Sequence, residues 1–212
     1  MDRYASIPQS ASLPAPLAQG SLVIGITGGS GCGKTTLLNL IRSKGGLVLD
    51  CDAIYHQLLK TDPSLVEAIS RRFPGTVENG ILDRKKLGAI VFADEAALAD
   101  LNAITHAAVK QEVLQQLAAK PALAAIDAIG LFEGDLASLC HVTVAVTAPE
   151  EDRVRRLMAR DGISEDYARS RIAAQHSEDW FQEKCAYTLR NDGTLDAFAT
   201  KCLAFLQTLD IM

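Results

Sequence analysis

Short apolar runs alternate with amphipathic stretches along most of the chain. The runs expected to form strands lie at residues 21–27, 47–49, 122–126, 141–146 and 186–189. Apolar runs without polar alternation are typical of strands that are buried on both faces of a parallel sheet. After the first run, a helical stripe of Leu37, Leu38 and Ile41 ends at Gly45-Gly46. The pattern therefore predicts an α/β fold with a mainly parallel sheet.

Residues 60–106 show helical periodicity and contain no convincing strand. Asp62-Pro63 is typical of a helix start, because proline is tolerated in the first turn and Asp62 or Thr61 can cap it. Asp83 is expected to cap a further helix. The sequence thus predicts an inserted helical lobe, which either binds a second substrate or simply covers the sheet.

His106 stands at an expected boundary between two helices. One helical pattern runs over residues 96–104, and a separate long helix is expected over residues 107–118. A lone histidine has either a structural or a catalytic role, and position alone leaves both open.

Two short, arginine-rich helices are predicted within residues 150–180. Residues 147–150 match a capping box, and a second helix is expected from Ser164 to about residues 175–176. Their arginines are Arg153, Arg155, Arg156, Arg160, Arg169 and Arg171. As a group these suit a helical lid that closes over a polyphosphate, whereas any single arginine is also explained by a solvated helix face.

The 212 residues suit one domain with insertions. The expected division is a flexible tail at residues 1–20, a core at 21–58, 107–148 and 185–208, a helical acceptor lobe at 60–106 and a lid at 150–180. The net charge of −5 argues against a nucleic-acid groove, and no apolar run reaches the length of a membrane span. The tail lacks the basic start and apolar region of a signal peptide.

Five scattered cysteines form no C-x-x-C pair, so neither a disulfide framework nor a zinc site is expected. The composition therefore favours a reducing, cytoplasmic compartment. Cys32 and Cys51 are explained as small buried thiols rather than as catalytic groups.

A phosphate-binding motif follows the first predicted strand. It is Gly28-Gly29-Ser30-Gly31-Cys32-Gly33-Lys34-Thr35, which matches G-x-x-x-x-G-K-[ST], and a helix is predicted directly after it. In this setting backbone N–H groups and the helix start bind phosphate oxygens. Lys34 is expected to reach the β and γ phosphates of a nucleotide, and the Thr35 hydroxyl to ligate Mg²⁺.

Acidic residues follow the second and third predicted strands, at the sheet edge where ligands gather in open α/β folds. Asp50 and Asp52 follow the second strand, and Asp127 ends the third. One acid of the first pair can cap the next helix while the other holds a metal or accepts a proton, and which of them faces the substrate stays open. Asp127 is expected to hold Mg²⁺ through water.

The order of these motifs resembles the dephospho-coenzyme A kinase family over residues 22–208. Beyond the P-loop, the matching features are Asp50-Cys51-Asp52, residues 82–87, residues 91–94, His106, residues 127–133, residues 156–162, residues 171–175 and Asn191-Asp192-Gly193. The chain departs from the family pattern twice, because Ala107 follows His106 where the family usually has proline and Ile129 replaces another proline. Both departures concern the expected acceptor pocket.

The resemblance implies a P-loop kinase-type three-layer sandwich that transfers the γ-phosphoryl group of ATP, with Mg²⁺, to the ribose 3′-hydroxyl of dephospho-coenzyme A. Asp52 would accept or orient the hydroxyl proton, and Lys34 and Arg160 would stabilise the transferring group. The implied ATP-binding residues are Gly29, Ser30, Gly31, Cys32, Gly33, Lys34, Thr35, Thr36, Asn191 and Gly193. The implied acceptor-binding residues are Asp52, His106, Asp127 and Phe132, and the metal ligands are Thr35 and Asp127.

Two alternatives remain open at this point. Another P-loop small-molecule kinase, for example one acting on a nucleoside, would share Lys34 and Thr35 and differ in the inserted lobe. A non-catalytic ATP-binding module would need no acid on the acceptor side. Nothing in the sequence indicates an obligate protein partner, a nucleic acid or a membrane.

Overall fold

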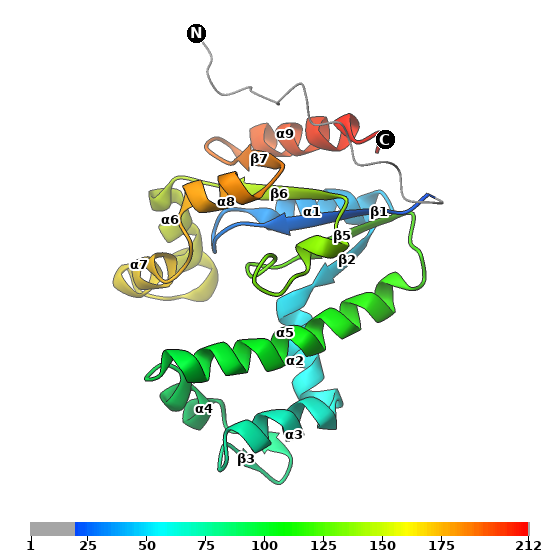
Figure 1. Ribbon diagram of the computed structural model, residues 1–212. Coiled ribbons are helices and arrows are strands. Elements are labelled where there is room, and N and C mark those ends of the chain that lie inside the picture. The colour runs from blue at the N-terminus through cyan, green and yellow to red at the C-terminus, as the bar shows by residue number, and fades with distance from the viewer. Residues whose placement is uncertain (1–19, 212) are drawn as a thin grey trace.

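The computed structural model describes residues 20–211, and a parallel sheet of five strands lies at its centre (Figure 1). Its strands are β1 (Leu22–Thr27), β2 (Leu47–Asp50), β5 (Leu123–Asp127), β6 (Val142–Thr147) and β7 (Tyr187–Arg190). They lie in the order β2-β5-β1-β6-β7, and every neighbouring pair is parallel. The predicted α/β class and all five predicted strands are confirmed.

Helices cover both faces of this sheet. On one face α1 (Lys34–Ser43) and α9 (Leu195–Thr208) pack against the strands in a core that contains Leu37 and Phe198. On the other face α2 (Cys51–Thr61) and α5 (Glu95–Leu117) pack over a core that contains Val113 and Ile126. In Figure 1, α9 lies above the sheet and α5 below it. The expected three-layer arrangement is therefore present.

The strand register brings the predicted site residues to one edge. Ile26 lies opposite Asp127 in the β1–β5 pair, and Asp50 lies opposite the same Asp127 in the β2–β5 pair. The P-loop leaves β1 directly after Thr27. Because parallel strands end at the same edge, the phosphate-binding loop and both strand-end acids lie side by side.

The inserted region has a small core of its own. It consists of α3 (Pro63–Arg72), the hairpin strands β3 (Val77–Glu78) and β4 (Ile81–Leu82), α4 (Arg84–Val91) and the first half of α5. Ile69, Phe73 and Leu87 are buried within it. The side chains of Asp62 and Asp83 cap α3 and α4, as predicted.

The prediction that this region contains no strand is wrong. Two-residue strands are too short to show periodicity, but the turn between them has a recognisable signal. Asn79 and Gly80 both have positive φ, at 52° and 77°, as the Asn-Gly turn of a hairpin requires.

The predicted helix boundary at His106 is also wrong. Helix α5 is continuous over 23 residues and passes through His106. Ala107, which stands where the resembled family usually has proline, is a strong helix former and lets the helix continue. The division of the chain at residues 106 and 107 therefore falls inside one helix.

The arginine-rich segment contains three helices, α6 (Glu150–Asp161), α7 (Glu165–Ala173) and α8 (Glu178–Lys184). Ser164 caps α7 as predicted, but the predicted capping box before α6 does not form. Thr147 instead belongs to β6, and its hydroxyl is buried without a hydrogen-bond partner among the described residues. The seven-residue α8 was not predicted, because it spans less than two helical turns.

Within the described part of the chain, no helix has both the length and the apolar character needed to cross a membrane. Of the tail predicted at residues 1–20, all but Gly20 lies outside the described residues.

Candidate functional site

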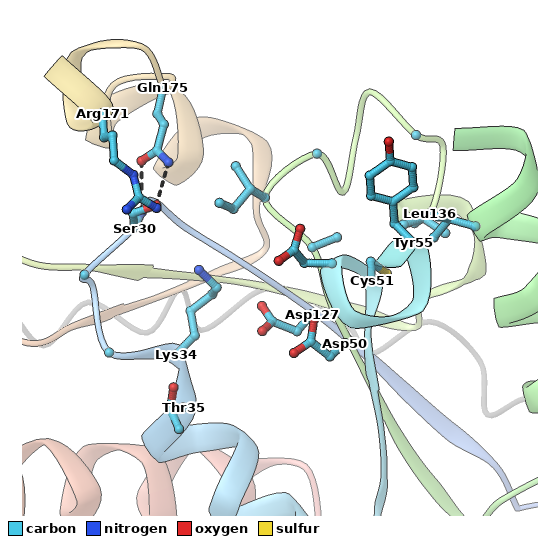
Figure 2. Close-up of a pocket in the computed structure, with 18 of the residues that line it drawn as sticks. Ser30, Lys34, Thr35, Asp50, Cys51, Tyr55, Asp127, Leu136, Arg171 and Gln175 are labelled. Atoms are coloured by element: carbon cyan, nitrogen blue, oxygen red, sulfur yellow. Dashed lines mark hydrogen bonds between the residues drawn. The ribbon is translucent and has the colours of Figure 1, made fainter. Parts of the chain in front are cut away.

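A cleft of about 730 Å³ lies at the carboxyl edge of the sheet (Figure 2). The P-loop, the start of α2, the residues after β5, the middle of α5 and the helices α6 and α7 contribute to its walls. It brings together most of the predicted site residues, namely Ser30, Gly31, Gly33, Lys34, Thr35, Asp52, His106, Asp127 and Arg160. Gly29, Cys32, Thr36, Asn191, Gly193 and Phe132 do not line it directly.

The backbone of the P-loop requires glycine at its two ends. Gly28 has φ of 129°, and a Cβ atom there would overlap the carbonyl oxygen of Val146. Gly33 has φ of 96° and immediately precedes α1, where a Cβ atom would overlap the side-chain amide of Asn191. Since L-residues with a side chain rarely adopt such φ values, the loop conformation depends on these glycines.

Side chains from other segments hold three successive carbonyl groups of the loop. Arg153 donates to the Ser30 carbonyl at 3.0 Å, and Arg156 donates to that of Gly31 at 3.1 Å. Asn191 donates to the Cys32 carbonyl at 2.9 Å. In a trans peptide the carbonyl and the next N–H point in opposite directions, so Gly31 and Gly33 turn their N–H groups away from these donors.

Lys34 and Thr35 begin helix α1 beside this loop. The Lys34 ammonium group donates to the Gly28 carbonyl at 2.8 Å, so its side chain folds back along the loop (Figure 2). The first N–H groups of α1 have no intrahelical acceptor, and the helix dipole adds partial positive charge at the same place. The site therefore combines the features of an anion-binding cradle.

The acids of the Asp50–Asp52 pair have different surroundings. Asp50 Oδ1 accepts a hydrogen bond from the Ala53 N–H at 3.0 Å and thereby caps α2. Asp52 lies in the first turn of α2 with its side chain 86% exposed, and its Oδ2 is 3.8 Å from Nε2 of His56. The structure therefore uses Asp50 as the helix cap and leaves the Asp52 carboxylate accessible at the cleft.

Asp127 is the buried acid of the site. Burial raises the pKa of its carboxyl group, Lys34 lowers that pKa, and the charge of Asp50 raises it further. Its Oδ1 is buried and has no hydrogen-bond partner among the described residues. A buried, unpaired carboxylate oxygen beside a lysine is unfavourable unless a cation or a donor binds to it.

The described residues contain no group of three His, Cys, Asp or Glu side chains arranged to hold a metal. This fits Mg²⁺ in a phosphate site, where one or two protein oxygens suffice and phosphate and water supply the remaining ligands. Asp127, whose Oδ1 is buried and unpaired, and Thr35, which carries a hydroxyl group, both line the cleft and are the residues that fit such an ion.

The arginines of α6 and α7 divide into two groups. Arg156, Arg160 and Arg171 line the cleft. The others are Arg153, which is buried against the loop, Arg155, which is exposed beside Asp152, and Arg169, which contacts Glu150, Glu151 and Glu165. Periodicity predicted the group as a whole, but only the fold shows which members face the cleft.

Asp161 holds two of the cleft arginines. Arg160 donates to both carboxylate oxygens of Asp161, at 2.7 and 3.0 Å, and Arg171 donates at 2.7 Å. The hydrogen bond from Arg160, followed by that from Arg171, lowers the pKa of Asp161 to about 2. Two guanidinium groups are thus kept close together at the edge of the cleft.

His106 reaches the cleft from the middle of α5. Its ring lies next to Gly134 and Gly130 in the loop that follows β5. Phe132 lies in the same loop but packs edge-on against Trp180, at a ring-centroid distance of 5.8 Å. The structure therefore places His106 at the cleft and Phe132 behind its wall.

Some cleft residues were not singled out as site residues by the sequence patterns, among them Tyr55, Arg171 and Gln175. Arg171 and Gln175 are four residues apart, and the helix expected to about residues 175–176 would place them on one face, which was a usable signal although α7 ends at Ala173. Tyr55 lies one turn after Asp52 on α2, and burial raises the pKa of its hydroxyl.

The chain is similar in sequence to proteins of one described family. The model of the family described as Dephospho-CoA kinase matches residues 22–197. A dephospho-CoA kinase from Thermus thermophilus is 36% identical over 193 residues, which cover 91% of this chain and 94% of that protein. One from Anaeromyxobacter dehalogenans is 37% identical and covers 88% of this chain and 92% of its own length.

Solved structures show the same fold. A crystal structure of a Thermus thermophilus protein superposes with a TM-score of 0.76 at 35% sequence identity, covering 90% of this chain and 99% of that one. A shikimate kinase from Bacteroides thetaiotaomicron matches with a TM-score of 0.54 at 15% identity, covering 88% of this chain and 98% of that one. At this low identity the second match supports the P-loop kinase fold alone.

Proposed function

Because the chain belongs to the dephospho-CoA kinase family, we propose that it transfers the γ-phosphoryl group of ATP to the ribose 3′-hydroxyl of dephospho-CoA, the last step of coenzyme A synthesis. The observation that carries the proposal is a single cleft shared by a phosphate-binding loop and an exposed carboxylate. Figure 2 shows Lys34 and Thr35 on one side of this cleft and Tyr55 of α2 on the other.

The P-loop side suits the donor. Lys34, the N–H groups of Gly31 and Gly33 and the start of α1 would bind and neutralise the triphosphate. Gly29, Ser30, Cys32 and Thr36 would contribute through the loop conformation. Asn191 supports this side indirectly through its bond to the Cys32 carbonyl, and Gly193 follows it in the turn before α9.

The α2 side suits the acceptor. Asp52 is accessible at the cleft, so it would accept or orient the proton of the attacking hydroxyl group, and such a base contributes about 10² to 10⁴ in rate. Asp50 is less suited to this role because it caps α2. His106 and Asp127 would contact the acceptor from α5 and β5, and Phe132 would shape the wall through its packing on Trp180.

Arg160 would stabilise negative charge on the transferring group, with Arg156 and Arg171 beside it. A mobile lid made of residues 150–180 would close these arginines over the phosphates and exclude water, which otherwise competes as an acceptor. Residues 60–106 would form the acceptor lobe, and residues 21–58, 107–148 and 185–208 the core.

Mg²⁺ is the proposed cofactor, held by the Thr35 hydroxyl and, through water, by Asp127. The unpaired, buried Oδ1 of Asp127 supports this assignment. When bound, the ion would neutralise part of the charge of the phosphate groups. We also place the reaction in the cytoplasm, because the five cysteines are free thiols. The expected partners are small molecules, because the net charge of −5 argues against a nucleic-acid groove.

The decisive experiment offers the protein ATP and Mg²⁺ with dephospho-CoA, a nucleoside, shikimate or no acceptor. We expect rapid consumption of ATP only with dephospho-CoA, and a product that phosphorus NMR identifies as the ribose 3′-phosphate. Preferred transfer to the nucleoside or to shikimate would contradict the proposal in favour of another small-molecule kinase. ATP that binds but survives with every acceptor would identify a non-catalytic module.

A further inference from the structure

Two residues of the α6–α7 region bind all three polar groups of Ser30 in the P-loop. Gln175 Oε1 accepts from the Ser30 N–H at 2.9 Å, and Gln175 Nε2 donates to the Ser30 hydroxyl at 2.7 Å. Arg153 Nε donates to the Ser30 carbonyl at 3.0 Å. Figure 2 shows the paired bonds between Gln175 and Ser30.

Arg153 also fixes the amide of Gln175. Its Nη2 donates to Gln175 Oε1 at 3.0 Å, which is the same oxygen that accepts from the Ser30 N–H. Because Arg153 can only donate, this bond requires the amide oxygen of Gln175 to lie beside Arg153, which leaves Nε2 to face the Ser30 hydroxyl. The buried arginine and the glutamine therefore act as one unit against the loop.

Ser30 is a residue whose orientation needs such support. Gly29 and Gly31 flank it, and glycine gives the backbone a wide choice of conformations. The Ser30 carbonyl and the Gly31 N–H belong to one planar peptide group, so fixing the first also fixes the second. Gly31 lines the cleft, where its N–H is available to a phosphate oxygen.

Apolar packing that does not include Gln175 joins α7 to α6. Helix α7 packs against α6 through Ala168 and Ile172, which are buried with Val154 and Leu157. Gln175 lies just beyond the end of α7 and lines the cleft. Its side-chain bonds therefore act on the P-loop rather than on the packing of the segment that carries it.

We propose that Gln175 is a positioning residue of the phosphate site, which together with Arg153 orients Ser30 so that the loop is preformed for the ATP phosphates. The inference rests on the proposed function only in taking ATP as the ligand of the loop. It assigns to Gln175 an effect on nucleotide affinity and no contact with the reacting atoms.

The test replaces Gln175 with methionine, which keeps the length of the side chain and removes its hydrogen bonds. Calorimetry with a non-hydrolysable ATP analogue and Mg²⁺, without acceptor, should show about tenfold weaker binding, since both hydrogen bonds to Ser30 are lost. The KM for ATP should rise by the same factor while the KM for dephospho-CoA stays constant. Gln182→Met, at an exposed position of α8, is the matched control and should bind as the wild type does.

A double-mutant cycle with Ser30→Ala separates positioning from general damage. Ser30→Ala alone removes one of the bonds and should weaken analogue binding about threefold. In the Gln175→Met background the same change should have no further effect, because the partner is already absent. Thermal melting without nucleotide should fall by only a few degrees in Gln175→Met, which loses the bond from Arg153, and should be unchanged in Ser30→Ala.

Unchanged analogue binding in Gln175→Met would overturn the inference. So would equal effects of Ser30→Ala in both backgrounds, or a loss of affinity that parallels a loss of thermal stability. The binding measurement needs no turnover, so it remains valid if the wild type fails to phosphorylate dephospho-CoA. The failure of the proposed function and the failure of this inference are therefore distinguishable.

Discussion

The P-loop is bound by side chains from α6, the end of α7 and the residue after β7, whereas the acceptor side of the same cleft has few such supports. Arg153, Arg156 and Asn191 hold three of the loop carbonyls. On α2, by contrast, the Asp52 side chain is 86% exposed, and its Oδ2 lies 3.8 Å from Nε2 of His56. In the proposed division of the cleft, the donor half is therefore held in place by other segments, and the acceptor half is left open to the second substrate.

This difference has a physical reason. A triphosphate has the same shape in every reaction that uses it, so a rigid cradle lowers the entropic cost of binding. An acid that accepts a proton must reach the hydroxyl group of a second substrate and remain ionised until then, which exposure to water favours. We therefore expect substitutions on the donor side to affect nucleotide binding, and substitutions on the acceptor side to affect transfer.

The largest effect is expected from Lys34→Ala. Removing a preorganised positive charge beside the transferring group should lower turnover by about 10³. Lys44→Ala, at an exposed lysine just beyond the end of α1, is the matched control and should retain turnover within a factor of two. A coupled assay of ATP consumption measures both variants, and similar losses in the two would contradict the role of Lys34.

Arg160→Ala tests whether the arginines that line the cleft contribute more to turnover than the other arginines of α6 and α7 do. Arg160 lines the cleft and Arg155 points to solvent beside Asp152 on the same helix. We expect Arg160→Ala to lower the single-turnover rate by about 10², because a charge near the transferring group is lost, and Arg155→Ala to have little effect. Loss of affinity for both substrates with an unchanged single-turnover rate would make Arg160 a binding residue instead.

Asp127→Asn should separate stability from activity. Because burial raises the pKa of Asp127, its ionised form destabilises the folded state at neutral pH. The neutral variant should therefore melt a few degrees higher, for a gain of about 1 kcal/mol, while turnover falls about tenfold to a hundredfold.

The pH dependence of this gain has a definite sign. Folding raises the pKa of the Asp127 carboxyl group above its value of 3.8 in the unfolded chain. Such a group stabilises the folded state at a pH below the unfolded-state pKa, and this contribution is lost as the pH rises through the folded-state pKa. The melting difference between Asp127→Asn and the wild type should therefore shrink as the pH falls toward 4. A difference that is independent of pH would show that the effect does not come from the charge.

The smallest effect on turnover is expected in the core beneath the donor site, where the change concerns stability. Burial raises the pKa of the Cys202 thiol from 9.0 to about 12, so the thiol stays protonated in the folded protein while it ionises in the unfolded chain. The free energy of unfolding should fall by about 1.4 kcal/mol per pH unit between these values for this thiol alone. Cys202→Ala should reduce that slope in urea unfolding at pH 8 to 11, and an unchanged slope would refute the attribution.

Much of the sheet was predictable because its strands are buried on both faces. The runs at residues 21–27, 122–126 and 141–146 are mainly apolar, and each matches a strand to within one residue. The P-loop was predictable because its glycines serve a backbone conformation that few sequences can adopt. The apolar runs and the glycine pattern are both local features of the sequence, so they predict the same structure whatever the tertiary contacts are.

The errors arose where several interpretations of a local pattern were possible. A boundary was expected at His106, but Ala107 continues the helix through it. Residues 147–150 have the composition of a capping box, yet Thr147 is taken up by β6. In both cases a helix is present. The helix propensity of Ala107 carries α5 through the expected boundary, and strand pairing of Thr147 in β6 delays the start of α6.

The roles of the arginines could not be predicted from periodicity. Arg169 and Arg171 lie two residues apart on α7, but Arg169 is bound by three glutamates and Arg171 lines the cleft. That distinction depends on how α6 packs against α7. The same is true of Gln175, whose partner Ser30 is 145 residues away in the sequence.

The measurement that tests the account most directly is phosphoryl transfer to dephospho-CoA by Asp52→Asn, with ATP binding measured in parallel. If the exposed acid serves the acceptor, transfer should fall by about 10² to 10⁴ while ATP affinity is retained. Asp50→Asn, in which asparagine can still cap α2, should lose far less transfer activity. Nearly full turnover by Asp52→Asn, or an equal loss in both variants, would contradict the division of the cleft into donor and acceptor halves.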